Sequence, residues 1–529
     1  MDASLRTAMA RLAEIGSEPP GPEPAFLGWP GPEREDVAAT VADPWSELPA
    51  ARGGDVDLAY LSLHEAADLL RKGDVSPVEL CRVALDRIAA HDPELGAFIT
   101  VTADRALEGA AAAEREIARG DHRGPLHGIP ISLKDVVATA GVLTTSGSQL
   151  HAARVPAVDA SAWAALSAAG AVLVGKNNLM EFAYSSSVTN ERWGTTRNPW
   201  DLERTSNGSS SGSAVAVAVG MSWASVCSET GASIQRPASF CGVVGLKPTY
   251  GRVSRAGVSP TSWSMDHVGV ITRSVLDAAM MLEVLAGADP ADPTTAAQPT
   301  DRWSAAIDPC DALAGARIGV PRRHIDGHVD EEVGVAFWAA IADCRAAGAR
   351  IVEIDPRELE YAGTTSVTIR SAEASAHHAR TLRLDPTGYS EALRRQLERG
   401  LAISAEEYLL AQRARRAIGD AVAAVFADVD VIAAPTTPTA ATLIEDGMAA
   451  LGDRPWEIGA HQYNLARVFS LIGLPVVSLP SGYTPTGLPT SIQLAGPRWG
   501  ERALLRLAHD YEQQTRWWRP PPRYAGEGS

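Results

Sequence analysis

Apolar positions along the chain form two kinds of pattern that follow one another. Short β-branched or aliphatic runs predict strands at 130–133, 171–174, 223–228, 317–320, 350–354, 429–434, 475–479 and 491–494. Stripes repeating every three to four residues predict helices at 62–91, 103–119, 159–169, 274–287, 331–347, 405–426 and 500–514. Ser76 followed by Pro77 is typical of a helix start. The alternation predicts an α/β fold with a mixed, twisted sheet covered by helices on both faces.

The spacing of prolines and charged residues divides the chain further. Prolines crowd residues 17–55, so 1–57 is interpreted as a short helix followed by an extended arm. A single large domain is expected over 58–515, with a tail at 516–529, although the length of 529 residues also allows two fused lobes. Within the domain, 289–312 is predicted as a surface connection. Residues 360–415 are predicted as a helical cap within a variable, substrate-shaping region at 360–465.

Composition and charge narrow the class of protein. The 45% apolar and 21% charged fractions are ordinary for a folded soluble chain. A net charge of −17 disfavours a broad contact surface for nucleic acid, which needs clustered Lys and Arg. The apolar run at 214–227 is shorter than the ~20 residues that span a bilayer, and it is interpreted as a buried helix running into a strand.

Cysteines and histidines give no sign of a metal centre or of a disulfide framework. The five cysteines are odd in number and form no C-x-x-C pair: Cys81, Cys227, Cys241, Cys310 and Cys344. This pattern favours a reducing compartment, and a cytoplasmic location is expected. The pairs His324/His328 and His377/His378 lack neighbouring ligands, so neither a metal nor another cofactor is predicted.

The richest chemistry lies at 205–237, where serine and glycine are concentrated beside an Ala/Val helix. A loop of small residues that opens a helix can present N–H groups to an anion. A flexible Ser/Gly linker is the alternative, which the apolar segments on both sides disfavour. Gly208 to Gly212 matches the G-x-S-x-G elbow with Ser210 at its centre, but that motif needs a preceding strand, and residues 203–207 are polar.

A lysine ends the first apolar run, in the segment Gly128-Ile-Pro-Ile-Ser-Leu-Lys134. A strand-end lysine commonly extends its ammonium into solvent. If Lys134 is buried instead, desolvation lowers its pKa from about 10.4 and lets the amine serve as a general base. These residues alone leave both possibilities open.

Several ordered blocks together resemble the amidase signature family. They are the Lys134 segment, Gly175-Lys-Asn-Asn-Leu-Met-Glu-Phe, Gly194-Thr-Thr-Arg-Asn-Pro-Trp, the Ser/Gly region, Cys241-Gly-Val-Val-Gly-Leu-Lys-Pro-Thr, Ser264-Met-Asp-His-Val-Gly, Ala434-Pro-Thr-Thr-Pro, Gly473-Leu-Pro-Val-Val-Ser-Leu-Pro and Pro489-Thr-Ser-Ile-Gln-Leu-Ala-Gly. The resemblance covers roughly residues 58–515. It implies hydrolysis of a carboxamide C–N bond by a Ser-cisSer-Lys triad on one α/β domain.

Carried onto this chain by motif position, the resemblance implies a role for each site residue. Lys134 would be the base, Ser209 the relay in a cis peptide bond, and Ser233 the nucleophile. The backbone N–H groups of Thr230, Gly231, Ala232 and Ser233 would form the oxyanion hole. Residues expected to support the site or contact the substrate are Ser210, Glu229, Gln235, Arg236 and Asp266.

Three residues of the nucleophile block depart from the family pattern Asp-x-Gly-Gly-Ser-Ile-Arg. Ala232 stands where a glycine is usual, and its methyl group adds strain if this position needs a positive φ. Gln235 stands in place of the arginine, with Arg236 one position later, and Glu229 replaces the aspartate. Because the triad is complete, these changes are expected to alter specificity and not to abolish activity.

The expected function is therefore that of an amidase acting on a small-molecule amide, with no nucleic acid and no membrane, and with a homodimer as an open option. One alternative is an A-type subunit of a tRNA-dependent amidotransferase. The N-terminal arm, the altered Ser233 block and the acidic charge are arguments against it. Another alternative is a relative that cleaves esters or carbamates. A non-catalytic family member is disfavoured because no triad residue is missing.

Overall fold

A computed structural model describes residues 57–185, 187–190, 192–307, 311–445 and 465–525. The predicted N-terminal helix and arm, including Trp29 and Trp45, lie outside the described residues, as does Cys310. The proposed limits of the domain at 58 and 515 stay predictions.

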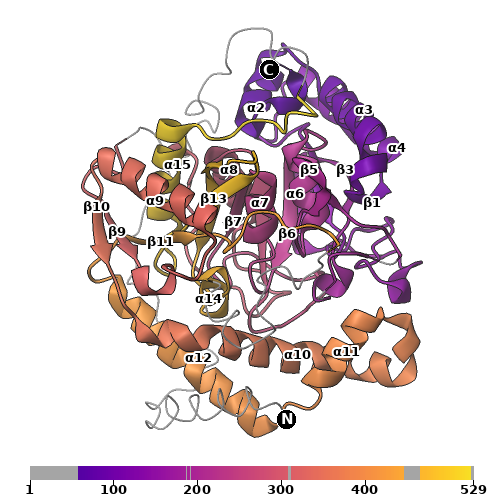
Figure 1. Ribbon diagram of the computed structural model, residues 1–529. Coiled ribbons are helices and arrows are strands. Elements are labelled where there is room, and N and C mark those ends of the chain that lie inside the picture. The colour runs from indigo at the N-terminus through magenta and orange to yellow at the C-terminus, as the bar shows by residue number, and fades with distance from the viewer. Residues whose placement is uncertain (1–56, 186, 191, 308–310, 446–464, 526–529) are drawn as a thin grey trace.

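A mixed sheet of eleven strands forms the centre of the molecule (Figure 1). Its strands run in the order β1 (Phe98–Val101), β3 (Val172–Asn177), β2 (Pro130–Lys134), β6 (Ala224–Glu229), β8 (His267–Thr272), β7 (Val244–Lys247), β12 (Val476–Tyr483), β13 (Pro489–Ala495), β11 (Val431–Pro435), β9 (Arg317–Val320) and β10 (Arg350–Glu353). β2 pairs in parallel with β3 and β6, whereas β6 pairs antiparallel with β8. The predicted α/β class with a mixed sheet is confirmed.

Helices pack against this sheet or form a separate cap. Those around the sheet are α2 (Leu63–Lys72), α3 (Pro77–Leu95), α4 (Ala103–Ala118), α5 (Ser161–Ala168), α6 (Ser211–Ala218), α7 (Gln235–Cys241), α8 (Val275–Leu285), α9 (Glu331–Ala346), α14 (Leu465–Leu471) and α15 (Glu501–Thr515). The helical periodicity predicted over 62–91 belongs to two helices, because Gly73 adopts a left-handed φ of 77° and ends α2. Ser76 then caps α3, with Pro77 at its first turn, as expected.

Some strands carried too weak a sequence signal to be predicted. β7 and β8 each contain a glycine and a charged or imidazole side chain, and β1 has only four residues. The polar segment before the Ser/Gly loop is also a strand, β5 (Asp201–Thr205), which corrects the expectation that it lacks one. β5 pairs with β4 (Arg197–Asn198) in a separate two-stranded sheet and forms an isolated bridge between Arg204 and Leu443, so it does not join the central sheet.

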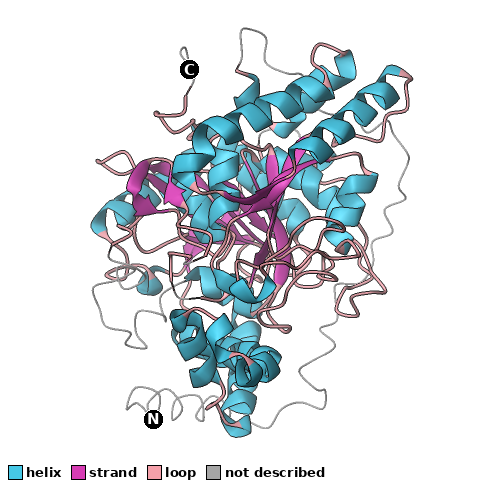
Figure 2. Cartoon of the chain, turned by 90° about the vertical axis from the view of Figure 1, so that its right-hand side faces the viewer, coloured by secondary structure: helices cyan, strands magenta, loops and turns pink. Residues whose placement is uncertain are grey.

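The helical cap predicted over 360–415 consists of α10 (Ala362–Leu384), α11 (Glu391–Gly400) and α12 (Ala405–Val425), which lie together below the sheet in Figures 1 and 2. A buried carboxylate, Glu373 of α10, connects the cap to the loop before β8. It accepts hydrogen bonds from the Ser262 hydroxyl, from the Ser264 amide and hydroxyl, and from the Tyr408 hydroxyl. The cap is therefore held to the sheet by specific polar contacts.

The segment after α15 packs back on the first helices. The Tyr524 carbonyl accepts a hydrogen bond of 2.6 Å from the Tyr60 hydroxyl and one of 2.9 Å from Arg87. Trp517 lies against Tyr483 and Trp518 against Tyr60. Among the described residues, no helix combines the length and the apolar character that crossing a membrane requires.

Candidate active site

The residues singled out from the sequence gather where neighbouring parallel strands end. Lys134 is the last residue of β2, and Glu229 is the last residue of the adjacent β6. The loop that follows β6 carries Ser233 and leads into α7, while Ser209 precedes α6. Carboxyl ends of parallel strands form a common edge where ligands bind in α/β folds.

Lys134 is fully buried, which settles the choice left open by the sequence. Its ammonium donates a hydrogen bond of 2.7 Å to the Ser209 hydroxyl and bonds of 3.1 Å to the Ser228 carbonyl and hydroxyl oxygens. Burial lowers the pKa of Lys134 to about 8. About a tenth of the lysine is then neutral at pH 7, and this form can accept a proton.

Ser209, which accepts the hydrogen bond from Lys134, and Ser210 lie directly before α6. The peptide bond between Gly208 and Ser209 is cis. The Ser210 amide donates to the Ser233 carbonyl at 3.2 Å, which holds the two serine loops against each other. Among the described residues no hydrogen bond joins the Ser209 and Ser233 hydroxyls. Such catalytic contacts often tighten only when substrate is bound.

The loop at Gly231, Ala232 and Ser233 has the features of an anion-binding turn. All three residues are buried, and within the described structure none of their N–H groups donates to another protein group. Buried N–H groups normally have a partner, so free ones are available for a bound oxygen. Ala232 has a φ of 71°, the left-handed conformation that was expected to strain an alanine at this position.

Glu229 organises the backbone that follows Ser233. Its carboxylate accepts hydrogen bonds from the Ile234 and Gln235 amides, from the Gln235 side chain at 2.7 Å and from the Ser470 hydroxyl at 2.5 Å. Gln235 thus supplies a neutral partner to Glu229. The Arg236 side chain donates instead to the Gly231 carbonyl, at 3.3 Å.

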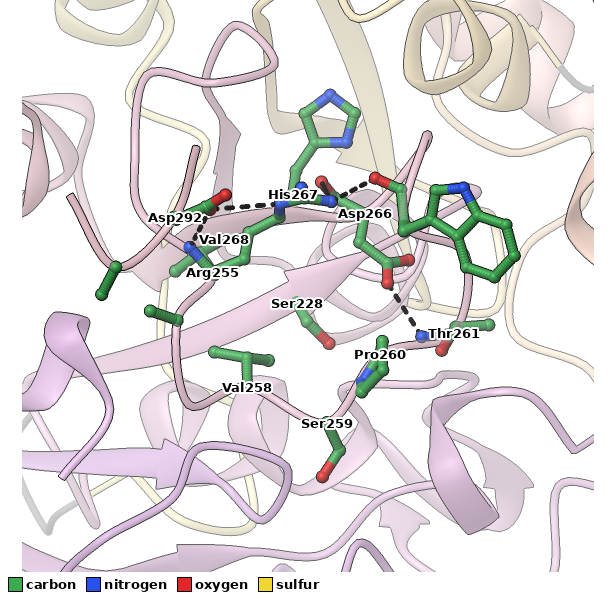
Figure 3. A pocket seen from close by; sticks show the side chains of 13 residues that line it. Ser228, Arg255, Val258, Ser259, Pro260, Thr261, Asp266, His267, Val268 and Asp292 are labelled. Carbon is green, nitrogen blue, oxygen red and sulfur yellow. Dashed lines mark hydrogen bonds and ion pairs between the residues drawn. The ribbon is translucent and has the colours of Figure 1, made fainter. Parts of the chain in front are cut away.

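Asp266 supports the loop from the opposite side. It accepts a hydrogen bond of 2.5 Å from the Thr230 hydroxyl and two from the Thr261 and Ser262 amides. Burial raises the pKa of Asp266 to about 6. A pocket of about 210 Å³ opens here between Ser228 and Pro260, and Figure 3 shows the Asp266 carboxylate directed toward Thr261. The pocket therefore lies beside Lys134's partner Ser228.

Several residues of the site were missed by sequence reasoning. Ser228 and Ser470 each bind a predicted site residue, but an isolated serine carries no signal. Arg370 of α10 and Arg467 of α14 lie next to Gly231. A signal existed for Arg467, because it is the one charged residue in the apolar helix Leu465–Leu471.

The histidine pairs do not form a metal site. Within the ranges that the structure describes, no group of three His, Cys, Asp or Glu side chains could hold an ion. His378 is buried, and its ring packs against Phe182 and Tyr389 in the cap.

Comparison with known proteins agrees with this geometry. The Amidase family model matches residues 79–505. The chain belongs to the amidase signature family. It is 38% identical, over 88% of its length and 99% of the relative's, to the A-type subunit of glutamyl-tRNA(Gln) amidotransferase from Moorella thermoacetica. Family members hydrolyse amide C–N bonds, so this chain is an amidase.

Solved structures show the same fold. The native peptide amidase from Stenotrophomonas maltophilia is 33% identical, with a TM-score of 0.75 over 88% of this chain and 98% of that one. An s-triazine catabolic enzyme, whose structure is described as an unexpected vestigial protein complex, is 32% identical with a TM-score of 0.80. That match covers 87% of this chain and 100% of the other.

The expectation that the partner is a small-molecule amide, with no nucleic acid and with a homodimer as the only assembly considered, is wrong. The curated relative is named as one part of an enzyme for a tRNA-linked substrate, and one solved relative was found in a protein complex. The acidic net charge was a weak argument, because a partner protein can supply the basic contacts that nucleic acid requires.

Proposed function

We propose that the chain hydrolyses a carboxamide through an acyl-enzyme on Ser233. The Ser233 oxygen attacks the carbonyl carbon while its proton passes to Ser209, and the Ser209 proton passes to neutral Lys134. The proton then returns along the same path to the leaving nitrogen as the C–N bond breaks, and water releases the acid. The observation that carries the proposal is the 2.7 Å contact between the Lys134 ammonium and the Ser209 hydroxyl in a fully buried site.

The oxyanion of the tetrahedral intermediate is proposed to lie against the turn from Thr230 to Ser233. Support comes from the free N–H groups of Gly231, Ala232 and Ser233 and from the Asp266 and Glu229 hydrogen bonds that hold the turn on both sides. One donor of this kind is worth about 2.7–4 kcal/mol of transition-state stabilisation.

An A-type subunit of an amidotransferase is the second candidate, and one observation favours it over a free-standing amidase. The chain spans 99% of the length of the Moorella relative at 38% identity. In that setting the nitrogen released at Ser233 would be transferred with the help of partner subunits. The four described cysteines are free and buried, which supports a reducing compartment such as the cytoplasm.

Labelling with a sulfonyl fluoride or fluorophosphonate tests the chemistry. Wild type and the control Ser167→Ala should become labelled at Ser233, and Ser233→Ala should lose both label and amide turnover. Chelators should leave turnover unchanged, whereas a chelator-sensitive rate would contradict a serine mechanism.

Transfer to tRNA tests the second candidate. The chain is mixed with the remaining subunits of a tRNA-dependent amidotransferase, glutamyl-tRNA, glutamine as the nitrogen donor and ATP to activate the glutamyl carboxylate, and formation of glutaminyl-tRNA is measured. Turnover of free amides with no transfer would reject the amidotransferase candidate and leave the amidase chemistry intact.

A further inference from the structure

Three arginines from separate elements converge beside the proposed nucleophile loop. Arg236 lies in α7, Arg370 in the cap helix α10 and Arg467 in α14, and together they are called the arginine cluster. Arg236 and Arg467 are buried, and Arg370 is half-buried. The mechanism proposed above uses none of them.

The contacts of Gly231 place the cluster at the substrate position. A methyl group at Gly231 would have only two neighbours within 4 Å among the described residues, Arg467 Cγ at 3.7 Å and Arg370 Nη1 at 4.0 Å. Arg236 donates to the Gly231 carbonyl itself. Gly231 is two residues from Ser233, so the Cα atoms of these two residues are at most about 7 Å apart. The cluster therefore borders the nucleophile.

Arg370 has the geometry of a side chain prepared for an anion. Its guanidinium lies over the Tyr184 ring, 5.1 Å from the centroid, and the Tyr184 hydroxyl is anchored to Ser371 at 3.0 Å. Within the described residues Arg370 has no carboxylate partner, and its Nε and that of Arg236 make no hydrogen bond. Arginine presents a planar fork that matches a carboxylate, and aromatic stacking fixes its plane.

Charge repulsion within the cluster supports the same conclusion. Burial lowers the pKa of Arg236 to about 10, and the neighbouring Arg370 adds to this effect, while Glu229 opposes it. Burial and both other arginines lower the pKa of Arg467. Arg236 and Arg370 therefore repel each other, and a bound anion would lower this cost.

We propose that the amide substrate carries a carboxylate, and that Arg370 binds it beside Gly231 with Arg236 and Arg467 completing the site. The inference rests on the proposed hydrolysis at Ser233 and adds the substrate class. Because guanidinium groups repel an ammonium, an amide with a carboxylate alone should be a better substrate than the zwitterion with the same carbon chain.

Kinetics with matched amides test the proposal. The substrates are glutaramate, its uncharged methyl ester and glutamine, with succinamate as a shorter analogue. Wild type should prefer glutaramate to the ester and to glutamine by about 10- to 100-fold in kcat/KM, as expected for one or two charged hydrogen bonds. Arg370→Gln should lose this preference mainly through a higher KM, whereas Arg380→Gln, exposed on the same helix, should keep it.

Equal rates for glutaramate and its ester, faster turnover of glutamine, or an equal loss on all substrates in Arg370→Gln would overturn the proposal. If the neutral amides are cleaved and Ser233 is labelled, the proposed hydrolysis stands while the carboxylate site fails.

Binding gives a readout that needs no turnover. Dicarboxylates from malonate to adipate should raise the melting temperature of the wild type and of Arg380→Gln, but not of Arg370→Gln, and glutaramide should have no effect. No shift with any dicarboxylate, or a larger shift with inorganic phosphate, would reject a carboxylate site.

Discussion

Two buried lysines lie at or next to the ends of neighbouring strands of the same sheet, yet their surroundings differ. Lys134 ends β2 and Lys176 is next to the end of β3, and burial lowers the pKa of each to about 8. Lys176 contacts the Val137 carbonyl at 2.6 Å, the Thr144 hydroxyl at 2.8 Å and the Asp135 carboxylate at 3.5 Å. Among the described residues Lys134 donates hydrogen bonds only to neutral oxygens, and one of them is the Ser209 hydroxyl.

The difference shows that burial alone does not make a lysine a base. Both amines lose hydration to a similar extent, but the Asp135 carboxylate stabilises the charged form of Lys176. Lys134 instead contacts a hydroxyl that can give up a proton. Its partners therefore determine its role, and the following substitutions test that distinction.

The largest effect is expected from removing the amine of Lys134. Lys134→Met should lower kcat/KM by about 10³-fold, the usual scale of a lost general base, and abolish the rise in rate with pH. Lys176→Met should keep the rate per folded molecule and the same pH profile. A comparable catalytic loss in both variants, measured with active-site titration, would show that the two lysines are not functionally distinct.

Stability should respond in the opposite order. Lys176→Met leaves the Asp135 carboxylate buried without its cation and should lower the free energy of unfolding by about 3–5 kcal/mol. The double variant with Asp135→Asn should recover part of this loss. Lys134→Met leaves no contacting carboxylate without its cation, so the decrease in the free energy of unfolding, measured with urea, should be clearly smaller. A larger loss for Lys134→Met would contradict the distinction.

The pH profile gives a finer test. In the proposed mechanism neutral Lys134 is the active form, so kcat/KM should rise with pH and level off above about 8. Ser228→Ala removes one acceptor that stabilises the ammonium, so the pKa of Lys134 should fall. The rise of kcat/KM with pH should therefore move to lower pH by about 0.4–1 unit. Thr144→Val, which removes an acceptor of Lys176, should leave this rise in place. A shift toward higher pH in Ser228→Ala would be the contrary result.

The smallest effect concerns backbone strain, which occurs in the loop of Ser233 and in the loop that binds Asp135. Ala232 has a φ of 71°, and Ser146, whose amide binds the Asp135 carbonyl, has a φ of 54°. Glycine at either position should relieve strain and raise the free energy of unfolding by up to about 1 kcal/mol. Only Ala232→Gly should also change the preference among amides, because only Ala232 borders the nucleophile. A changed preference among amides in Ser146→Gly would contradict this distinction between the two positions.

Much of the fold was predictable because periodicity reports burial directly. The strands ending in Lys134 and the run into Glu229 were recognised as apolar stretches, and the cap as a charged helical segment. β7 and β8 were missed because Gly245, Gly269 and His267 interrupt the apolar pattern, and sheet neighbours compensate for weak local preference.

The site was predictable only where ordered motifs carried it. Ser209, Ser233 and Lys134 followed from the family resemblance, and their roles stay predictions. Arg236 was expected at the site, but its meeting with Arg370 and Arg467 could not be predicted, because these arginines are far apart in the chain and meet only through the packing of α7, α10 and α14. The partner expectation failed for a different reason, since net charge describes one chain and not the assembly it joins.

Glu373 has a consequence for how this enzyme diversifies in evolution. One carboxylate receives hydrogen bonds from the loop at Ser262 and Ser264 and from Tyr408 of the cap. If the hydroxyls of the loop or of the cap are replaced while Glu373 is kept, the buried carboxylate loses hydrogen-bond donors. In an alignment of relatives, positions 262, 264, 373 and 408 should therefore covary, and lineages that lose the acid at 373 should have lost the hydroxyls as well.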